Sequence, residues 1–479
     1  MRPPSARAIT AAAVAAAAIL LSLQLLVPPI VGLANNADFE KVMGYVGLQY
    51  RTDVPAERYF GWILREFDRV TPGWYRSGYH TSETLLTAAA RLFTEPFARD
   101  GVFDIRILGA LHAALLCLGI GLLVLACKDL VPPAQILTGA LLVLFFTDVG
   151  YAAVLNTLYS QAASLVFLLL TAGVAAISIR RGGLEGFRVP AYFLCALLFV
   201  LAKPQHALQG LPLALLGWRI ATPAARRGAG LLAAALLLAS AVSYVRAPRI
   251  IRNVALYHTV FYEMLPHSPD PAADLAALGL DPDLIALSHQ SAYEKDSPIW
   301  TPEFSARFFD RYGYGDLLRF YLARPGRLAA LLQRASLRAF TLRPQGFGNF
   351  EKSLGLPARA TTSRFSLWSS VRKAATPAAV PAIVLLLGGT IAWCAAGWRH
   401  ASPRGRLVRE SLAVLAAMAG LEFLVCALAN AAIELDRQLF AFQAMCDLLL
   451  IAALTATVSA ATARASSRSR PSLGRSEPE

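Results

Sequence analysis

The chain opens with a long apolar segment, Ala8–Leu33 (AITAAAVAAAAILLSLQLLVPPIVGL), and a polar stretch follows it directly, Asn35-Asn36-Ala37-Asp38-Phe39-Glu40-Lys41. A helix needs about 20 mostly apolar residues to cross a bilayer, so the first segment is long enough to span one. The polar stretch then begins where the helix leaves the hydrocarbon layer. It places the carboxylates of Asp38 and Glu40 close together at a membrane surface.

An acidic pair at a membrane face suits two kinds of chemistry. One carboxylate can act as a general base toward a hydroxyl group. Alternatively, Asp38 and Glu40 together can hold a divalent cation, Mg²⁺ or Mn²⁺, against a phosphate. A plainer interpretation is a solvated helix end with ordinary polar residues, and the pair alone leaves these interpretations open.

Composition identifies the class of protein. Of the 479 residues, 56% are hydrophobic and 16% are charged, whereas a soluble domain carries about 25% charged residues. This composition indicates a membrane protein. The net charge of +14 does not indicate nucleic-acid binding, because much of the arginine lies in short loops between apolar segments. All six cysteines lie in or at the ends of apolar segments, so the sequence contains neither a disulfide framework nor zinc-ligand spacing.

The apolar segments predict an all-α polytopic membrane protein with about ten transmembrane helices. The predicted spans are Ala8–Leu33, Ile105–Ala126, Ala134–Phe146, Ala162–Ile179, Pro190–Ala202, Ala207–Ile220, Ala229–Val245, Pro377–Trp398, Leu407–Ala429 and Gln438–Thr462. The third, fifth and sixth are short, so each must extend, tilt or be broken. A cleaved signal peptide is the alternative for the first segment, although its apolar run exceeds the 7–15 residues of such a peptide.

The loops between the predicted spans encode an orientation. With the N-terminus inside, every inside loop carries cations and the short outside loops carry almost none, as the positive-inside rule requires. The inside cations are Lys128; Arg180, Arg181 and Arg188; Arg219, Arg226 and Arg227; Arg399, Arg404, Arg406 and Arg409; and Arg464, Arg468, Arg470 and Arg475. The polar residues outside the loops collect in two large blocks, roughly Asn35–Asp104 and Arg246–Lys373, and both blocks then lie outside.

This orientation divides the chain into six parts. The expected parts are a first transmembrane helix (1–34), a first extracytoplasmic loop with the Asp-x-Glu motif (35–104), a transmembrane bundle (105–245), a large extracytoplasmic loop region (246–376), C-terminal transmembrane helices (377–463) and a disordered basic cytoplasmic tail (464–479).

Two cations depart from the charge bias. Lys203 and Arg437 stand at outer ends of predicted spans, on the same side as Asp38. Ionisable residues at such depths usually face a cavity or a partner, and snorkelling to the headgroups is the alternative. Arg246 and Arg249, with Arg252, share one helical face and can receive a phosphate or an anionic headgroup.

Two further outside segments carry candidate features. Tyr159 and Gln161 lie in a short outside loop. They can either hydrogen-bond a sugar or belong to an aromatic belt at the membrane interface with helix-capping residues beside it. Residues 81–93 show leucines at helical spacing, which predicts an amphipathic helix that lies on the outer leaflet or packs against the spans. No nucleotide-binding glycine loop is present in the sequence.

Several short motifs resemble those of the GT-C glycosyltransferases, which take a sugar from a polyprenyl-phosphate carrier at the outer membrane face. The matching stretches are Asn35-Asn36-Ala37-Asp38-Phe39-Glu40-Lys41-Val42-Met43, Asn156-Thr157-Leu158-Tyr159-Ser160-Gln161, Ala202-Lys203-Pro204-Gln205-His206-Ala207, Leu265-Pro266-His267-Ser268-Pro269-Asp270-Pro271 with Leu278-Gly279-Leu280, and Asp436-Arg437-Gln438-Leu439-Phe440. Bacterial glycan-biosynthesis hexosyltransferases are the most similar group. Asp38-Phe39-Glu40 fits their modified Asp-x-Asp, whereas Gln161 stands where an acidic residue is expected.

The resemblance implies a GT-C-like fold and transfer of a hexose from a polyprenyl-phosphate donor to a glycan or lipid-linked acceptor. The resulting candidate residues are Asp38 and Glu40 as catalytic or metal-binding groups; Lys203, Arg437, Arg246 and Arg249, chosen as cations at the outer face, at the donor phosphate; and Asn35, Asn36, Tyr159, Gln161, Gln205 and His206 at the substrate. The implied partners are the donor, the acceptor and the lipid bilayer. The implied location is a bacterial inner membrane, with the site facing the periplasm.

Two other functions fit the composition. A transporter or flippase for lipid-linked glycans needs ionisable residues inside spans and often repeated halves. Glu422 and Asp447 are within-span candidates, but no internal repeat is visible. A non-catalytic assembly protein is the third possibility, and in that case the acidic pair would be dispensable.

Overall fold

The computed structural model describes residues 4–75, 80–94, 101–429 and 433–468. Within these ranges, seven helices are long and apolar enough to cross a membrane. They are α1 (Ala6–Leu25), α5 (Ile105–Ala126), α8 (Ser160–Arg180), α11 (Arg226–Arg246), α18 (Ala379–Trp398), α19 (Pro403–Ala429) and α21 (Phe440–Arg468). The chain is thus a multi-pass membrane protein, as its composition predicts.

The three short predicted segments are also helical, but none is a straight span. The third is a pair of helices, α6 (Pro132–Phe146) and α7 (Val149–Leu155), bent by 62°. The fifth and sixth are α9 (Arg188–Val200) and α10 (Gly210–Ile220), joined by a 3-10 turn, Pro204–Gln209. Against the ten predicted spans, the described part of the chain contains seven by length and composition, or eight if the bent pair is one span.

The α9–α10 hairpin accounts for the difference between the ten predicted spans and the eight obtained when the bent pair is counted as one. Both counts are even, so the predicted orientation is unchanged. Leu184, before α9, pairs with Ala221, after α10, so the hairpin returns to the side from which it started. Pro204 has no backbone N–H, and three polar side chains follow within the turn. These residues end the helix before it reaches a full span length.

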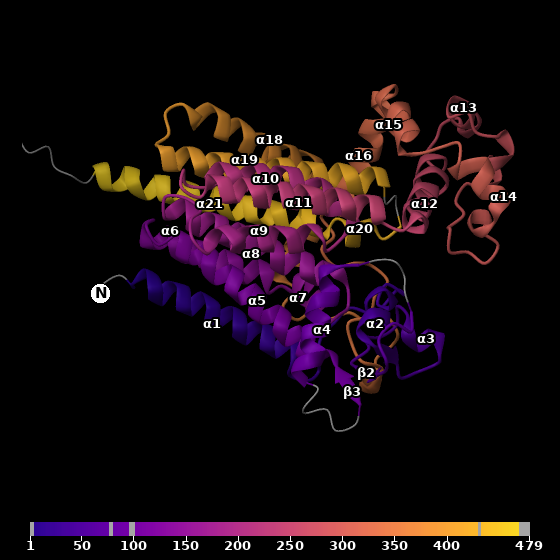
Figure 1. Ribbon diagram of the computed structural model, residues 1–479, viewed down its shortest axis with the longest axis horizontal. Helices are drawn as coiled ribbons and strands as arrows, with labels where there is room; N and C mark the ends of the chain where they lie inside the picture. The colour runs from indigo at the N-terminus through magenta and orange to yellow at the C-terminus, as the bar shows by residue number, and fades with distance from the viewer. Residues whose placement is uncertain (1–3, 76–79, 95–100, 430–432, 469–479) are drawn as a thin grey trace, which may run out of the picture.

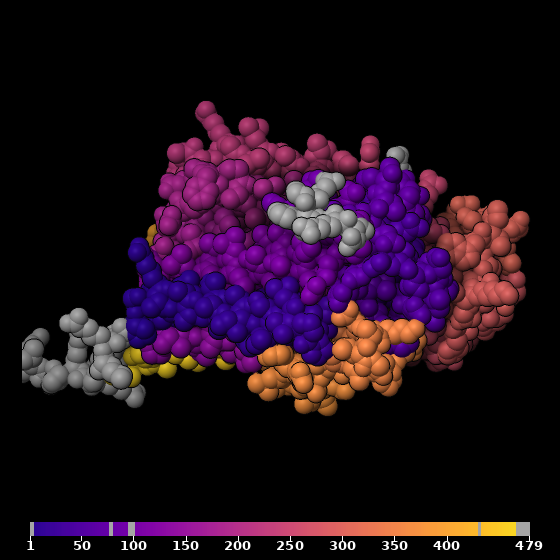
Figure 2. Space-filling view, turned by 90° about the horizontal axis from the view of Figure 1, so that it is seen from below, coloured from indigo at the N-terminus to yellow at the C-terminus, as the bar shows by residue number. Residues whose placement is uncertain are grey.

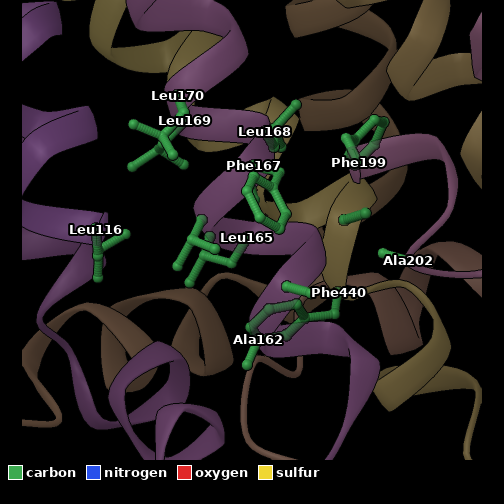
Figure 3. Close-up of a cluster of buried hydrophobic side chains, with 14 of the residues drawn as sticks. Leu116, Ala162, Leu165, Phe167, Leu168, Leu169, Leu170, Phe199, Ala202 and Phe440 are labelled. Atoms are coloured by element: carbon green, nitrogen blue, oxygen red, sulfur yellow. The ribbon is translucent and has the colours of Figure 1, made fainter. Parts of the chain in front are cut away.

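The central helix of the bundle is α8. Its most apolar stretch is 83% buried, whereas that of α18 is 11% buried, so α8 contacts protein and α18 faces lipid. Figure 3 shows Leu165, Phe167 and Leu168 of α8 among side chains of α5, α9 and α21. Gly119 of α5 permits close approach, because a Cβ there would lie 2.9 Å from Leu169 Cβ.

Both polar blocks lie at one end of the bundle, and the start of α1 and the end of α21 lie at the other (Figure 1). The first block contains α2 (Glu40–Val46), α3 (Pro55–Arg58), α4 (Ser82–Thr94) and a three-stranded antiparallel sheet, β1 (Leu48–Tyr50), β2 (Glu66–Arg69) and β3 (Val102–Asp104). The sheet departs from the predicted all-α class. Tyr50, Phe67 and Phe103 face each other across it and are buried, which stabilises strands too short to predict from periodicity.

The second block has its own aromatic core. It contains α12 (Arg249–Tyr257), α13 (Pro271–Ala277), α14 (Pro302–Phe304), α15 (Tyr314–Leu322), α16 (Pro325–Ala339) and α17 (Leu367–Ala374), with π-helical turns at His258–Met264 and Ser305–Phe309. Tyr257, Phe261, Phe304 and Phe308 pack together in this core.

An extended part of the second block joins the first. Ala34 N donates to Gly348 O at 2.9 Å, and Ile63 N donates to Phe350 O at 3.0 Å. Figure 2 shows this orange segment against the indigo N-terminal region. The two blocks are therefore connected by backbone hydrogen bonds as well as by the bundle.

The amphipathic helix α4 packs with an unexpected face inward. Its polar residues Glu83 and Thr87 are fully buried, whereas Leu85 and Leu92 are 60% and 62% exposed. Glu83 Oε1 lies 3.2 Å from His112 Nε2 of α5. The helix thus packs against the spans, one of the two predicted placements, while these leucines face outward.

The close contact of α5 with α8 gives a stability prediction. Gly119→Ala forces two backbones apart, and overpacking of this kind costs about 1–3 kcal/mol. We expect a lower melting temperature for the variant in thermal unfolding of the purified protein in detergent.

Gly388→Ala is the matched control. Gly388 also lies in a membrane helix, but a Cβ there meets nothing within 4 Å. Alanine should leave stability unchanged or raise it by about 0.5–1 kcal/mol. Equal melting temperatures for the two variants would contradict the assigned packing.

Candidate functional site

The candidate site is built around an ion pair between the first loop and the last. Asp38 Oδ2 lies 2.7 Å from Arg437 Nη2, and Asp38 Oδ1 lies 2.5 Å from Lys41 Nζ. Asn35 shapes the turn, because its Oδ1 accepts hydrogen bonds from the backbone N–H groups of Ala37 and Phe39. The turn thus presents Asp38 immediately before α2 begins.

Arg437 lies in the short helix α20 (Leu435–Gln438) and is 4% exposed. Its guanidinium binds Glu434, with Nη2 2.5 Å from Oε2, and stacks over the Tyr159 ring at 4.7 Å. Asn36 Nδ2 donates to both carboxylate oxygens of Glu434 at 2.8 Å. A buried guanidinium with this many partners is held in one orientation.

Electrostatics keep this pair ionised. Burial alone would raise the pKa of Asp38, but Lys41 and Arg437 outweigh it and hold that pKa well below its usual range. Burial alone would lower the pKa of Arg437, but Glu434 and Asp38 outweigh it and raise that pKa. Both groups are therefore charged at neutral pH.

A cavity of about 360 Å³ opens beside Asp38. Its polar wall comprises Asp38, Lys41, Thr81, Tyr159, Ser160, Lys203, Gln205, Arg252, Tyr314 and Gln438. Its apolar wall includes Ile251, Leu317, Leu318, Val425 and Leu428. The cavity therefore combines charged groups of both signs with a hydrophobic surface.

Lys203 supplies a cation to the cavity wall. Its Nζ donates to Gln438 Oε1 at 2.6 Å. Burial and the nearby charge of Arg437 lower the pKa of Lys203 to about 8. The ammonium group is thus charged at neutral pH, but only by a small margin.

A buried hydrogen-bond network supports the turn that carries Lys203. Glu422 of α19 is fully buried. It accepts from Gln205 Nε2 at 2.6 Å and Gln209 Nε2 at 3.0 Å, and one of its oxygens lies 3.1 Å from His206 Nδ1. Because three residues of one turn bind one carboxylate, Glu422 fixes the position of that turn.

Several predicted site residues come together. Asp38, Tyr159, Lys203 and Gln205 line the cavity, and Arg437 lies directly behind Asp38. Further predicted residues support these from behind: Asn35 and Asn36 as above, His206 through Glu422, and Gln161 through a 3.4 Å hydrogen bond from Nε2 to Arg437 O.

Three predicted residues lie elsewhere. Glu40 accepts hydrogen bonds from Tyr59 at 2.8 Å and Tyr50 at 3.3 Å, because it is already part of α2 and turns toward the sheet. Arg246 and Arg249 are exposed and do not line the cavity. Arg252 does, because the chain turns at Pro248 between α11 and α12, which breaks the single helical face assumed for the three arginines.

The separation of Asp38 from Glu40 bears on the predicted metal site. Lys41 and Arg437 bind both Asp38 oxygens, and Glu40 binds tyrosines. Over residues 4–75, 80–94, 101–429 and 433–468, no group of three or more His, Cys, Asp or Glu side chains is placed to hold a metal ion. The residues present do not form the predicted two-carboxylate site.

Sequence reasoning missed Glu434, Gln438 and the supporting role of Glu422. Gln438 directly follows Arg437, and its position next to a predicted site residue could have indicated that it also lies at the site. Glu434 adopts a left-handed backbone, with φ of 54°, which nothing in the local sequence indicates. Its pairing with Arg437 becomes visible only when the last loop is folded.

The comparisons with known proteins are consistent with this architecture. The family model described as "YfdI N-terminal transmembrane domain" matches residues 4–473. No curated protein and no solved structure matches the chain. Since the family model covers nearly the whole sequence, the chain belongs to the YfdI N-terminal transmembrane domain family.

Proposed function

We propose that this protein is a membrane glycosyltransferase that moves a hexose from a polyprenyl-phosphate donor to a surface glycan or lipid-linked acceptor. The observation that carries the proposal is the convergence of Asp38, Lys203 and Arg437 beside one cavity with an apolar wall. These residues come from three distant parts of the chain, and two of them are cations at the end of a membrane bundle.

The donor chemistry matches the two walls of the cavity. A polyprenyl-phosphate sugar carries an isoprenoid chain, an anionic phosphate and a polar sugar. The isoprenoid chain suits the apolar wall of Ile251, Leu317 and Leu428, and the phosphate suits Lys203 and Arg252. Preorganised cations stabilise the phosphate as it leaves the sugar, and they act strongly where water is excluded.

The ion pair accounts for how Asp38 becomes a base. With Arg437 and Lys41 bound, its pKa is too low for efficient proton abstraction. A donor phosphate in the cavity competes with Asp38 for Lys41, which lines the same cavity, and loss of a cationic partner raises a carboxylate pKa. Asp38 then takes the proton of the acceptor hydroxyl as that oxygen attacks the anomeric carbon and the lipid phosphate departs.

The same geometry weakens the transporter alternative. Its two candidates are structural, since Glu422 is bonded to the Gln205–Gln209 turn and Asp447 is bonded to Tyr151, Trp368 and Arg372. Neither lines the cavity beside Asp38. A carboxylate whose hydrogen bonds are all made to protein groups is not free to bind and release a transported molecule.

Orientation and location complete the proposal. The polar blocks share one end of the bundle (Figure 1), and the inside loops of the predicted topology carry the arginines. By the positive-inside rule, the site end faces the periplasm of a bacterial inner membrane. Polyprenyl-phosphate sugars and glycan acceptors would meet there.

Asp38→Asn tests the proposed base. We expect transfer to fall by about 10²–10⁴-fold, because an amide cannot accept the proton. The assay uses purified protein in liposomes with polyprenyl-phosphate glucose and its epimers, and with surface glycan from a deletion strain as acceptor. Asp53→Asn is the control, because the Asp53 side chain is fully exposed in the same block. Undiminished transfer by Asp38→Asn would remove Asp38 from the mechanism.

Lys203 gives a pH prediction. Because its pKa is about 8 in the free protein, kcat/KM for the anionic donor should fall as the pH rises above 8, by about tenfold per unit well above it. Lys203→Arg should keep kcat/KM constant through this range, since guanidinium stays protonated. Identical alkaline limbs in the two proteins would show that another group titrates.

A further inference from the structure

A second cavity, of about 650 Å³, lies within the helix bundle and shares no lining residue with the cavity beside Asp38. It is lined by residues of α5, α6, α8, α9, α10, α18, α19 and α21. The lining is almost wholly apolar, with Leu168, Leu415 and Ile451 as examples.

Charged residues are confined to one rim of this cavity. Arg180 ends α8, Arg404 begins α19, and Asp129 follows α5. Asp129 is shared by the two arginines, with its oxygens 3.6 Å from Arg180 Nη1 and 3.2 Å from Arg404 Nη2. One carboxylate faces two guanidinium groups, so the rim has a net positive charge.

Arg180 also has an unused donor. Its side chain is 9% exposed, and its buried Nε has no hydrogen-bond partner in the part of the chain that the structure describes. A buried donor without an acceptor is destabilising, because it has lost its hydrogen bond to water. An acceptor oxygen from a ligand would satisfy it.

We infer that this cavity binds one anionic phospholipid of the surrounding bilayer, with its acyl chains in the apolar interior and its phosphate at Arg180 and Arg404. Water does not fill a cavity of this apolar character, and an empty one loses the dispersion contacts of its lining. The rim charge selects an anionic headgroup over a zwitterionic one. The occupied site lies in the leaflet opposite the candidate catalytic site and is independent of the proposed reaction.

Native mass spectrometry of the whole protein tests this inference. Protein released from mild detergent is exposed to equal amounts of phosphatidylglycerol and phosphatidylcholine. We expect one retained phosphatidylglycerol per chain, at least tenfold in excess of phosphatidylcholine. Arg180→Ala should lose this preference.

Matched variants separate the charge from the space. Arg219→Ala removes an exposed arginine that does not line the cavity, and it should retain the lipid. Ala452→Phe fills the cavity from α21 and should abolish retention, whereas Ala234→Phe on exposed α11 surface should not. Melting temperatures near that of the parent show that each variant is folded.

Three outcomes would overturn the inference. The first is an equal amount of both lipids on the parent protein. The second is undiminished phosphatidylglycerol on both Arg180→Ala and Ala452→Phe. The third is a polyprenyl phosphate, instead of a phospholipid, copurifying at this rim and lost from Arg180→Ala.

Discussion

The buried charge of Arg437 is the constraint on which the site end of the molecule depends. A guanidinium removed from water is tolerated only when counter-charges and hydrogen bonds surround it. Here Asp38 comes from the N-terminal loop, Glu434 from the last loop and Tyr159 from the start of α8. Apart from Nη1, which has no hydrogen-bond partner among the described residues, the guanidinium is thus bound by three distant segments, and the cavity lies where they meet.

Elsewhere in the bundle, buried charged groups likewise join helices through ion pairs and hydrogen bonds. Asp447 of α21 binds Arg372 at 2.6 Å, Tyr151 at 2.7 Å and Trp368 at 2.9 Å. Glu83 pairs with His112, and Glu422 holds the Gln205–Gln209 turn. Lipid offers no water to these groups, so each must find a protein partner. Each network thereby fixes how particular helices are placed relative to one another.

Hydropathy predicts the long helices because every membrane span needs about 20 consecutive, mostly apolar residues. It does not predict that α9 and α10 form a short hairpin, since the decisive polar turn, Lys203–Gln209, is brief. The meeting of Asp38, Lys203 and Arg437 was predictable from their common side of the membrane. Glu434 was not, because its role depends on a loop conformation and not on spacing. Glu40 does not face the cavity, because two residues close in sequence at a helix start need not point the same way.

The inverted packing of α4 has a consequence for where the protein rests in the bilayer. With Glu83 and Thr87 buried, the helix presents Leu85, Leu92 and Phe93 outward. Such side chains prefer the boundary between headgroups and hydrocarbon. The outer face of α4 is thus suited to contact this boundary, and Thr81, directly before the helix, lines the cavity beside Asp38.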